Sequence, residues 1–402
     1  MIEIELSYIW GNDDPTYAVL VEEFSQQYGV KVRLRRFDWT TAWADLFTMA
    51  SQGHGSDVSS IGSTWVRTLA KLDALRPFKS SEIAQIGGTS AFIEPSWQGA
   101  KIFGDERIWS IPWMGWMYVV CYRKDIFQEM GIDPSKAFAT PQSFQEMLAM
   151  LKTSPLEIPW LNPNATHPYS DFIHIAASWV WKASGEFISP AGDKALFASP
   201  QAIAGLACWL DSCRAVPEQY QQLGPLECVD MFLQKDVAAT LIDIRAANLI
   251  LHADFSHVQQ ENIGFSTLAD TPWVGGSNFI IWEHTRIYPE REHAAVELVK
   301  FLSREESGLK WRQDSNLLPT RMDALEKSYP PGNPLHEVIV SAARYGRPYY
   351  NAPHWRRVES QLSLALGTAV KDAQENPSAD SATILRNCLE PLARRLDIIL
   401  GT

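Results

Sequence analysis

Long apolar runs, an excess of basic charge and metal-type cysteine spacing are all missing from this chain. No apolar stretch approaches the roughly 18 residues that a transmembrane helix requires. The 402 residues carry 35 basic and 47 acidic side chains, a net charge of −12. Nucleic-acid affinity rests largely on clustered Lys and Arg, so this balance argues against a nucleic-acid partner. A short basic run, "VKVRLRRF", alternates and predicts the solvated face of a strand.

The five cysteines are odd in number and lack CxxC spacing. Cys208 and Cys213 lie five residues apart in a predicted helix, roughly 140° around its axis, and are not expected to pair. Buried free thiols, with at most one bridge, are the expectation. The opening "MIEIELSYIW" begins a strand and shows no signal peptide. A cytoplasmic protein and a mature exported protein with an added initiator Met both fit this start.

Catalytic motifs are also absent. The sequence contains no GxSxG, Walker A or GxGxxG pattern, and its nine histidines are scattered without HExxH or HxH spacing. We therefore predict no catalytic residue, no metal site and no cofactor. A glycosidase remains an alternative, because its two carboxylates are a spatial pair that 47 acidic residues can hide.

What the sequence has is a regular alternation of strands and helices at its start. Strands are predicted at 2–10 and 30–35, with helices at 15–28 and around 43–50. Trp43, Leu46, Phe47 and Ala50 are expected on the core face of the second helix. A strand, a small-residue turn and a helix follow in "DVSSIGSTWVRTLAKLDAL". This order predicts a mainly parallel sheet whose functional groups lie in loops after the strand ends.

Later elements carry clear helix signals. Thr140 and Pro141 begin a helix, and further helices are expected around 172–183 and 199–214. "VAATLIDI" predicts a buried strand, residues 155–170 a loop, and the last 50 residues mostly helix. Ser303 with Glu306 fits a capping box.

Sixteen tryptophans are the compositional excess. Trp109, Trp113 and Trp116 fall within eight residues, and Pro112 and Gly115 are expected to keep their segment irregular. Trp109 is expected in a core. Trp113 and Trp116 suit either a core or a flat surface for a sugar ring, because aromatic faces match the C–H faces of a pyranose.

Five segments in order carry a family resemblance. They are "IEIELSYIWGNDDPTYAVLVEEFSQQYGVKV", "GSDVSSIGSTWVRTLAKLDALRPF", "IWSIPWMGWMYVVCYRKDIFQEMGID" with "TPQSFQEML", "VGGSNFIIWEHTRIYPEREHAAVELVKFLSREESGLKWRQDSNLLPTR" and "ARYGRPYYNAPHWRRVESQLSLAL". Over essentially its whole length the chain resembles the family 1 extracellular solute-binding proteins, the sugar receptors of ABC importers, to which maltose-binding protein belongs.

The resemblance implies an α/β, two-lobed periplasmic-binding-protein fold of type II. Each discontinuous lobe would hold a central mixed sheet flanked by helices, with the ligand cleft between the lobes. The N-terminal lobe would comprise 1–115 plus 273–325, and the C-terminal lobe 116–272 plus 326–402. The chain would cross near 115, 272 and 325.

Ligand-binding candidates follow from the resemblance and from the loops after the strands. They are Trp10, Asp13, Trp39, Ser63, Thr64, Trp65, Trp113, Trp116, Tyr169, Asp243, Arg245, Gly276, Ser277, Asn278, Tyr350 and Trp355. Asp243 and Arg245 stand where the family usually has Gly followed by Trp, which replaces one sugar-stacking surface by a charged pair. An ion pair that braces the C-terminal lobe is the alternative for these two residues.

The implied function is a non-catalytic receptor that binds a carbohydrate, a di- or oligosaccharide, and delivers it to an ABC transporter permease. A monomer in the periplasm or outside the cell is expected, membrane-associated, with its leader absent from this sequence. The alternatives are a carbohydrate-active enzyme and a receptor for a charged non-sugar solute. Tyr349 and Tyr350 are similar to the tyrosine pair of ferric-ion receptors.

Overall fold

The computed structural model describes residues 2–9, 15–165, 172–234, 237–251, 259–352 and 354–401. The chain forms two compact units. Unit 1 contains Met1–Trp116, Gly275–Pro330 and Pro348–Pro353, and unit 2 contains Met117–Val274, Pro331–Arg347 and His354–Thr402. The boundaries expected from sequence assign 116, 326–330 and 348–353 to the second lobe and 273–274 to the first, whereas the former cluster with unit 1 and the latter with unit 2.

Unit 1 is built on one mixed sheet with the strand order β2-β1-β3-β8-β5. Strand β1 is parallel to both β2 and β3, and β3 is antiparallel to β8. Two short strands extend the sheet, β4 against β8 and β9 against β5. The strands are β1 (Ile2–Ile9), β2 (Val30–Phe37), β3 (Val58–Gly62), β4 (Leu75–Arg76), β5 (Ile111–Arg123), β8 (Val274–Trp282) and β9 (Leu318–Pro319).

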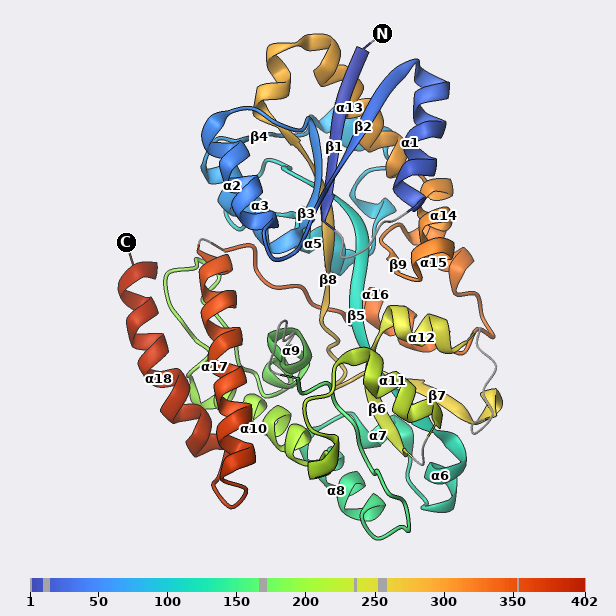
Figure 1. Cartoon of the computed structure of the whole chain (residues 1–402), viewed down its shortest axis with the longest axis vertical. Helices are drawn as coiled ribbons and strands as arrows, with labels where there is room; N and C mark the ends of the chain where they lie inside the picture. The colour runs from blue at the N-terminus through green and yellow to red at the C-terminus, as the bar shows by residue number, and fades with distance from the viewer. Residues whose placement is uncertain are drawn as a thin grey trace. The chain divides into compact units, whose positions relative to one another are not determined.

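Helices cover both faces of this sheet, with α2 and α3 on one side of β1–β3 and α1 and α14 on the other (Figure 1). The α-helices are α1 (Pro15–Tyr28), α2 (Ala42–Gln52), α3 (Val66–Lys71), α4 (Ser80–Gln85), α5 (Glu94–Ala100), α13 (Pro289–Leu302), α14 (Glu305–Ser315) and α15 (Met322–Ser328). Three 3₁₀ turns complete the unit, η1 (Ser63–Trp65), η2 (Thr89–Ala91) and η5 (Glu283–Ile287). The result is the three-layer packing that a mostly parallel start predicts.

Each face of the unit 1 sheet has its own aromatic core. On one face Trp282 and Ile280 pack with Leu46, Leu69 and other buried side chains of α2 and α3. On the other face Tyr17 lies 4.8 Å from Trp311 between ring centroids. The alternation of side chains along β8 explains this division, because successive residues of a strand point to opposite faces.

Unit 2 has a smaller sheet in which β5 lies between β6 and β7, antiparallel to both. Its strands are β6 (Ala239–Asp243) and β7 (Ile263–Ser266) beside the second half of β5. Helices dominate this unit: α6 (Lys124–Glu129), α7 (Pro134–Ala137), α8 (Pro141–Leu151), α9 (Phe172–Lys182), α10 (Pro200–Arg214), α11 (Pro225–Gln234), α12 (Ile244–Ile250), α16 (His336–Tyr345), α17 (Trp355–Glu375) and α18 (Ser381–Leu400). Two 3₁₀ turns belong to this unit: η3 (Glu218–Tyr220) lies between α10 and α11, and η4 (Gln260–Asn262) lies between α12 and β7.

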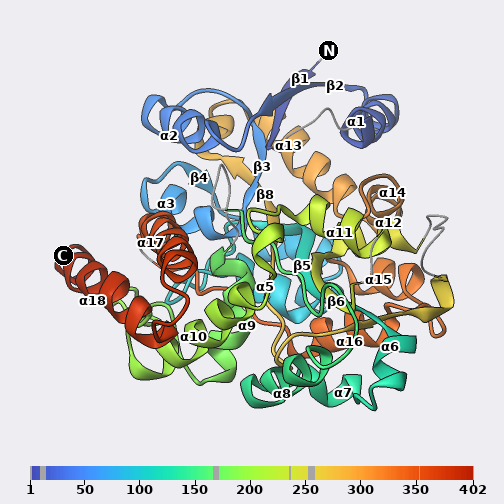
Figure 2. The same cartoon turned by 60° about the horizontal axis from the view of Figure 1, so that its bottom comes forward.

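The last two helices, α17 and α18, run side by side and pack on α10 (Figure 2). No helix among the described residues is both long and apolar enough to span a membrane.

Helix starts and strand positions at the beginning of the chain agree with the sequence predictions. Helix α1 begins at Pro15 and is followed by Gly29 at φ +66°, a left-handed position that glycine adopts without strain. Thr140 caps α8, and its hydroxyl accepts from the backbone N–H of Ser143 at 3.1 Å. All five cysteines are free, as expected for Cys208 and Cys213.

Three local predictions are wrong. Pro112 and Gly115 lie inside the continuous strand β5 and do not make an irregular segment. Proline is tolerated next to a strand start, and Gly115 leaves room for Leu318, whose side chain comes to 3.0 Å of the position of a Cβ. Phe47 is 47% exposed, because the buried stripe of α2 is formed by Ala42, Leu46 and Met49.

The third wrong prediction is the capping box. Ser303 lies in the last turn of α13, where its N–H donates to the carbonyl of Val299 at 2.9 Å. Helix α14 begins after Arg304, without a side-chain cap.

Close approach of β8 to β5 requires a glycine at 276. Gly276 has φ +146°, and a Cβ there would come to 2.0 Å of the carbonyl oxygen of Met114. We predict that Gly276→Ala lowers the free energy of unfolding by about 1–3 kcal/mol, because backbone must move to admit the methyl group. Chemical denaturation measures this. Gly367→Ala, in the interior of α17, is the control and is expected to be neutral or stabilising by up to about 1 kcal/mol. Equal effects of the two substitutions would contradict the close approach.

A charged turn secures Trp109 in the unit 1 core. Asp105 accepts hydrogen bonds from the guanidinium of Arg107 at 2.9 Å and from the indole of Trp109 at 2.9 Å. The hydrogen bond from Arg107 is the largest cause that lowers the pKa of Asp105 to about 2.

Since the pKa of folded Asp105 lies below its ordinary value, the charged carboxylate stabilises the fold above about pH 4 and loses this effect as the pH falls toward 2. We predict that Asp105→Asn is less stable than the wild type at pH 7, and that the difference shrinks on acidification. Thermal unfolding across pH 2–7 measures it. A difference that stays constant over this range would show that the carboxylate charge is not the cause.

Candidate functional site: an aromatic edge of unit 1

Strands β2 and β3 end at the same edge of the unit 1 sheet, because both are parallel to β1. Ile9, the last residue of β1, pairs with Phe37 at the end of β2. On the other side of β1, Tyr8 pairs with Ser60 near the end of β3. The residues that follow β2 and β3 therefore meet at this edge, the usual location of functional loops in an α/β sheet.

Three tryptophans gather there, and we call Trp39, Trp43 and Trp65 the tryptophan trio. Trp65 is 5% exposed and stands edge-on to both partners. The ring centroids are 5.6 Å apart at 74° for Trp39 and 5.5 Å apart at 72° for Trp43. Edge-to-face pairs of this kind are favourable and fix ring orientation.

Exposure separates the roles within the trio. Trp39 is 40% exposed, whereas Trp43 is half-buried against the core of α2 and α3. Trp39 thus presents aromatic surface to solvent, and the buried Trp65 packs against it. Sequence reasoning selected Trp39 and Trp65 as ligand contacts but assigned Trp43 to the core alone.

Asp38 fixes the turn that carries Trp39. Its carboxylate accepts from the backbone N–H of Thr40 at 2.8 Å and from the hydroxyl of Thr40 at 2.5 Å. These hydrogen bonds, the hydroxyl bond first, lower the pKa of Asp38. The residue immediately before the exposed Trp39 is consequently an ionised acceptor.

The segment around Asn351 is hydrogen-bonded to η1 and to the start of α3. The amide of Asn351 donates to the carbonyl of Ser63 at 3.1 Å and accepts from the backbone N–H of Arg67 at 3.3 Å. The guanidinium of Arg67 donates to the carbonyl of Asn351 at 3.1 Å. Tyr350, 38% exposed, precedes this anchor. The candidates predicted from sequence include Tyr350 but neither Asn351 nor Arg67. The sequence signal for Asn351 was its position after two tyrosines, and Arg67 had no such signal.

The other unit 1 candidates lie deeper. Ser63 and Thr64 are half-buried in η1, and Trp116 is half-buried in β5. Ser277 is 5% exposed, and the amide of Asn278 donates to the hydroxyl of Ser110 at 3.0 Å inside the core. Gly276 allows the close approach of β8 to the backbone of β5.

Of the two roles left open for Trp113, a core position or a stacking surface, the structure shows the core position. It is 4% exposed, and its indole donates to the hydroxyl of Tyr17 at 3.0 Å. Its ring lies 4.7 Å from Phe279 and 5.1 Å from Trp311 between centroids. The alternation of β5 directs it into the core of unit 1, so a ligand does not reach it there.

In unit 2, Asp243 and Arg245 do not act as one charged group. Asp243 is the N-cap of α12, where its carboxylate accepts from the N–H of Ala246 at 2.8 Å. Arg245, in the first turn of that helix, is exposed. Trp355 is 1% exposed and packs 6.3 Å from Phe187, again a core position. Trp10, Asp13 and Tyr169 lie outside the described residues.

The described residues also bear on whether this chain holds a metal ion. No group of three His, Cys, Asp or Glu side chains there is arranged to hold a metal ion. Of the two tyrosines compared with a ferric-ion site, Tyr349 is 6% exposed and Tyr350 is 38% exposed.

The class of protein follows from this geometry and from comparison with known proteins. Residues 19–334 match the family described as bacterial extracellular solute-binding protein, and the chain belongs to that family. The family is extracellular, which implies a location in the periplasm or outside the cell. None of the curated proteins matches the chain.

Solved structures show the fold. The maltose-bound MalE3 of T. maritima is 17% identical over 99% of this chain and 100% of its own, with a TM-score of 0.76. The sugar-binding protein MalE of Xanthomonas citri is 18% identical over 99% and 97%, with a TM-score of 0.79. UgpB of Mycobacterium tuberculosis, in complex with glycerophosphocholine, is 16% identical over 98% of both chains, with a TM-score of 0.74. The predicted type II periplasmic-binding-protein fold is thereby confirmed.

Proposed function

We propose that this chain is a non-catalytic receptor that binds a carbohydrate, a di- or oligosaccharide, and delivers it to an ABC transporter permease. In this proposal it acts as a monomer, associated with the membrane in the periplasm or outside the cell, and has no nucleic-acid partner. The observation that carries the proposal is the exposed ring of Trp39, which follows the ionised acceptor Asp38 in sequence and is held edge-on by Trp65.

The chemistry of a sugar fits this edge. A pyranose has an apolar face of C–H groups, which packs on an indole ring, and a rim of hydroxyls that donate to carboxylates. Trp39 offers the ring and Asp38 the acceptor. Ser63 and Thr64 of η1, and Tyr350 next to the Asn351 that bonds to Ser63, are proposed as further hydroxyl partners.

Trp116 is half-buried in unit 1, and Arg245 is exposed in unit 2. We retain each as a proposed contact within its own unit. An arginine fork binds paired hydroxyls bidentately. We retain Trp10, Asp13 and Tyr169 as proposed contacts, and we assign structural roles to Trp113, Trp355, Ser277, Asn278 and Asp243.

A quaternary-ammonium solute is a second candidate ligand. Trp65 contacts both Trp39 and Trp43, and the exposed indole of Trp39 can attract a quaternary ammonium group, as tryptophan faces do. One similar structure, UgpB, holds glycerophosphocholine. A panel of maltose, longer maltooligosaccharides and glycerophosphocholine, followed by calorimetric titration, separates the two candidates.

The panel also tests the absence of catalysis. Recovery of every saccharide unchanged after long incubation is expected of a receptor. Release of new reducing ends would replace the proposal by the alternative of a carbohydrate-active enzyme.

Substitution at Trp39 tests the site directly. We predict that Trp39→Ala weakens binding of the best saccharide at least about tenfold, or about 1.4 kcal/mol, because its stacking surface is lost. The melting temperature should change little, since the ring is 40% exposed. Tyr288→Ala, which removes an aromatic ring that is 50% exposed on another part of unit 1, is the matched control and should leave the affinity unchanged.

A contrasting variant separates binding from folding. Trp113→Ala should lower the free energy of unfolding by about 3–5 kcal/mol, as expected for a large core side chain. Normal affinity in Trp39→Ala would refute the site, whatever the behaviour of Trp113→Ala.

A further inference from the structure

Strand β2 forms an outer edge of the unit 1 sheet. Among the described strands its neighbour is β1, and β2 ends the strand order. An edge strand offers backbone N–H and C=O groups that can pair with another extended segment. Peptide recognition by strand addition uses such an edge, with specificity supplied by alternate side chains.

A basic row follows one face of this edge. Lys31, Arg33 and Arg35 lie at every second position, so they point to the same face of β2. Their side chains are 60%, 60% and 46% exposed. In a chain with a net charge of −12, this row is a local positive feature.

The chain itself shows which chemistry pairs with this row. On the neighbouring strand β1, Glu3 lies opposite Lys31 and Glu5 lies opposite Arg33. Lys31 and Arg33 each approach Glu3 at 2.9 Å, and Arg33 approaches Glu5 at 3.2 Å. Arg35 lies opposite Ser7 and reaches Glu5 only at 3.9 Å. Three cations therefore face two carboxylates on the inner side, and the outer side of the row remains exposed.

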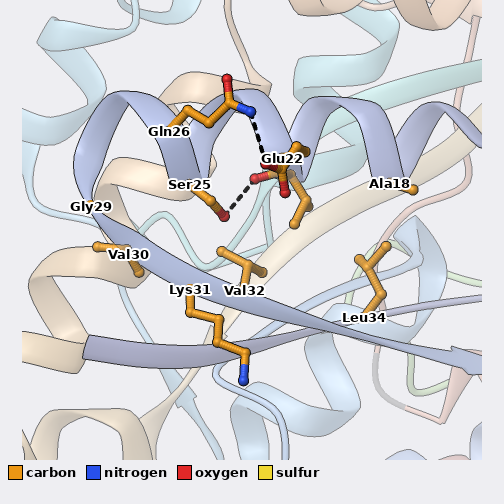
Figure 3. A pocket seen from close by; sticks show the side chains of 10 residues that line it. Ala18, Glu22, Ser25, Gln26, Gly29, Val30, Lys31, Val32 and Leu34 are labelled. Atoms are coloured by element: carbon orange, nitrogen blue, oxygen red, sulfur yellow. Dashed lines mark hydrogen bonds between the residues drawn. The ribbon is translucent and has the colours of Figure 1, made fainter. Parts of the chain in front are cut away.

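The other face of β2 lines a hollow of about 500 Å³ under α1. Val30, Val32 and Leu34 point toward the helix, while Lys31 points away from it (Figure 3). Glu22 and Gln26 of α1, hydrogen-bonded to each other at 2.8 Å, border the hollow. An added strand would thus meet apolar side chains on this face and cations on the opposite face.

We propose that the edge of β2 binds an extended peptide segment that alternates carboxylate and apolar side chains. Its backbone pairs with β2, its carboxylates continue the ladder of Glu3 and Glu5 on the far side of the basic row, and its apolar side chains enter the hollow under α1. A second copy of this chain is a poor occupant, because antiparallel pairing of two β2 strands sets like charges against each other.

The experiment uses the full chain and a fluorescein-labelled peptide of four Glu-Val repeats. Fluorescence anisotropy should show saturable binding that weakens with salt, as cross-strand ion pairs are screened. A second peptide has the same sequence, but the backbone nitrogens that would face β2 are methylated. It keeps its carboxylates and cannot donate the backbone hydrogen bonds of strand pairing. Its binding should be at least about tenfold weaker. Hydrogen exchange should slow in β2 on addition of the unmodified peptide alone.

Charge-reversal variants test the row. Arg35→Glu should weaken peptide binding at least about tenfold. This substitution leaves the ion pairs of Lys31 and Arg33 with Glu3 in place. Circular dichroism checks that the variant is folded. Lys371→Glu, an equal charge change at a side chain 70% exposed on α17, is the matched control and should not change the affinity.

The proposal is overturned by any of three results. They are no binding of the Glu-Val peptide, equal binding of its methylated form, or equal binding of a Lys-Val peptide. Absence of binding would leave the basic row the role of keeping the edge from pairing. Equal binding of the methylated peptide would show that no backbone ladder forms, and equal binding of the Lys-Val peptide that the cations select no carboxylates. Saccharide affinity is measured in parallel, since the β2 edge and the tryptophan trio are independent claims.

Discussion

Parallel pairing of β1 with both β2 and β3 is the constraint on which the candidate site depends. It brings Asp38 and Trp39, which follow β2, to the edge where Trp65 follows β3. Side chains 26 residues apart in sequence then come within ring-contact distance. The remaining strands support this arrangement: β8 pairs with β3, and the glycine at 276 lets β8 approach the backbone of β5.

Core packing accounts for most of the tryptophan excess. Twelve of the sixteen tryptophans are buried, and seven of these are among the largest fully buried side chains of the described residues. Most tryptophans therefore fill the cores of the two units. Trp39 is the tryptophan that the described residues expose, and Trp43 and Trp116 are half-buried. The exposed indole surface of the described tryptophans is correspondingly local, at one edge of one sheet.

Local signals made much of the fold predictable. Pro15 with Gly29 bounded the first helix, and Thr140 with Pro141 began α8, because caps and glycine turns act within a few residues. Errors arose where a tertiary neighbour decides. Gly115 lies in a strand because Leu318 fills the space of its missing side chain, and Trp113 is buried because Tyr17 and Trp311 cover its ring. The bond between Asn351 and Ser63 joins residues 288 positions apart, a separation that no local pattern reports.

The central claim is that a saccharide contacts the exposed indole of Trp39 in a chain of the extracellular solute-binding family. Two-dimensional NMR of the tryptophan indole N–H signals, assigned by substitution, observes this contact most directly. During titration with the saccharide that binds best, the account predicts large shifts for the signals of Trp39 and Trp65 and none for those of the core residues Trp97 and Trp209. Saturating saccharide that leaves the Trp39 signal in place would contradict it.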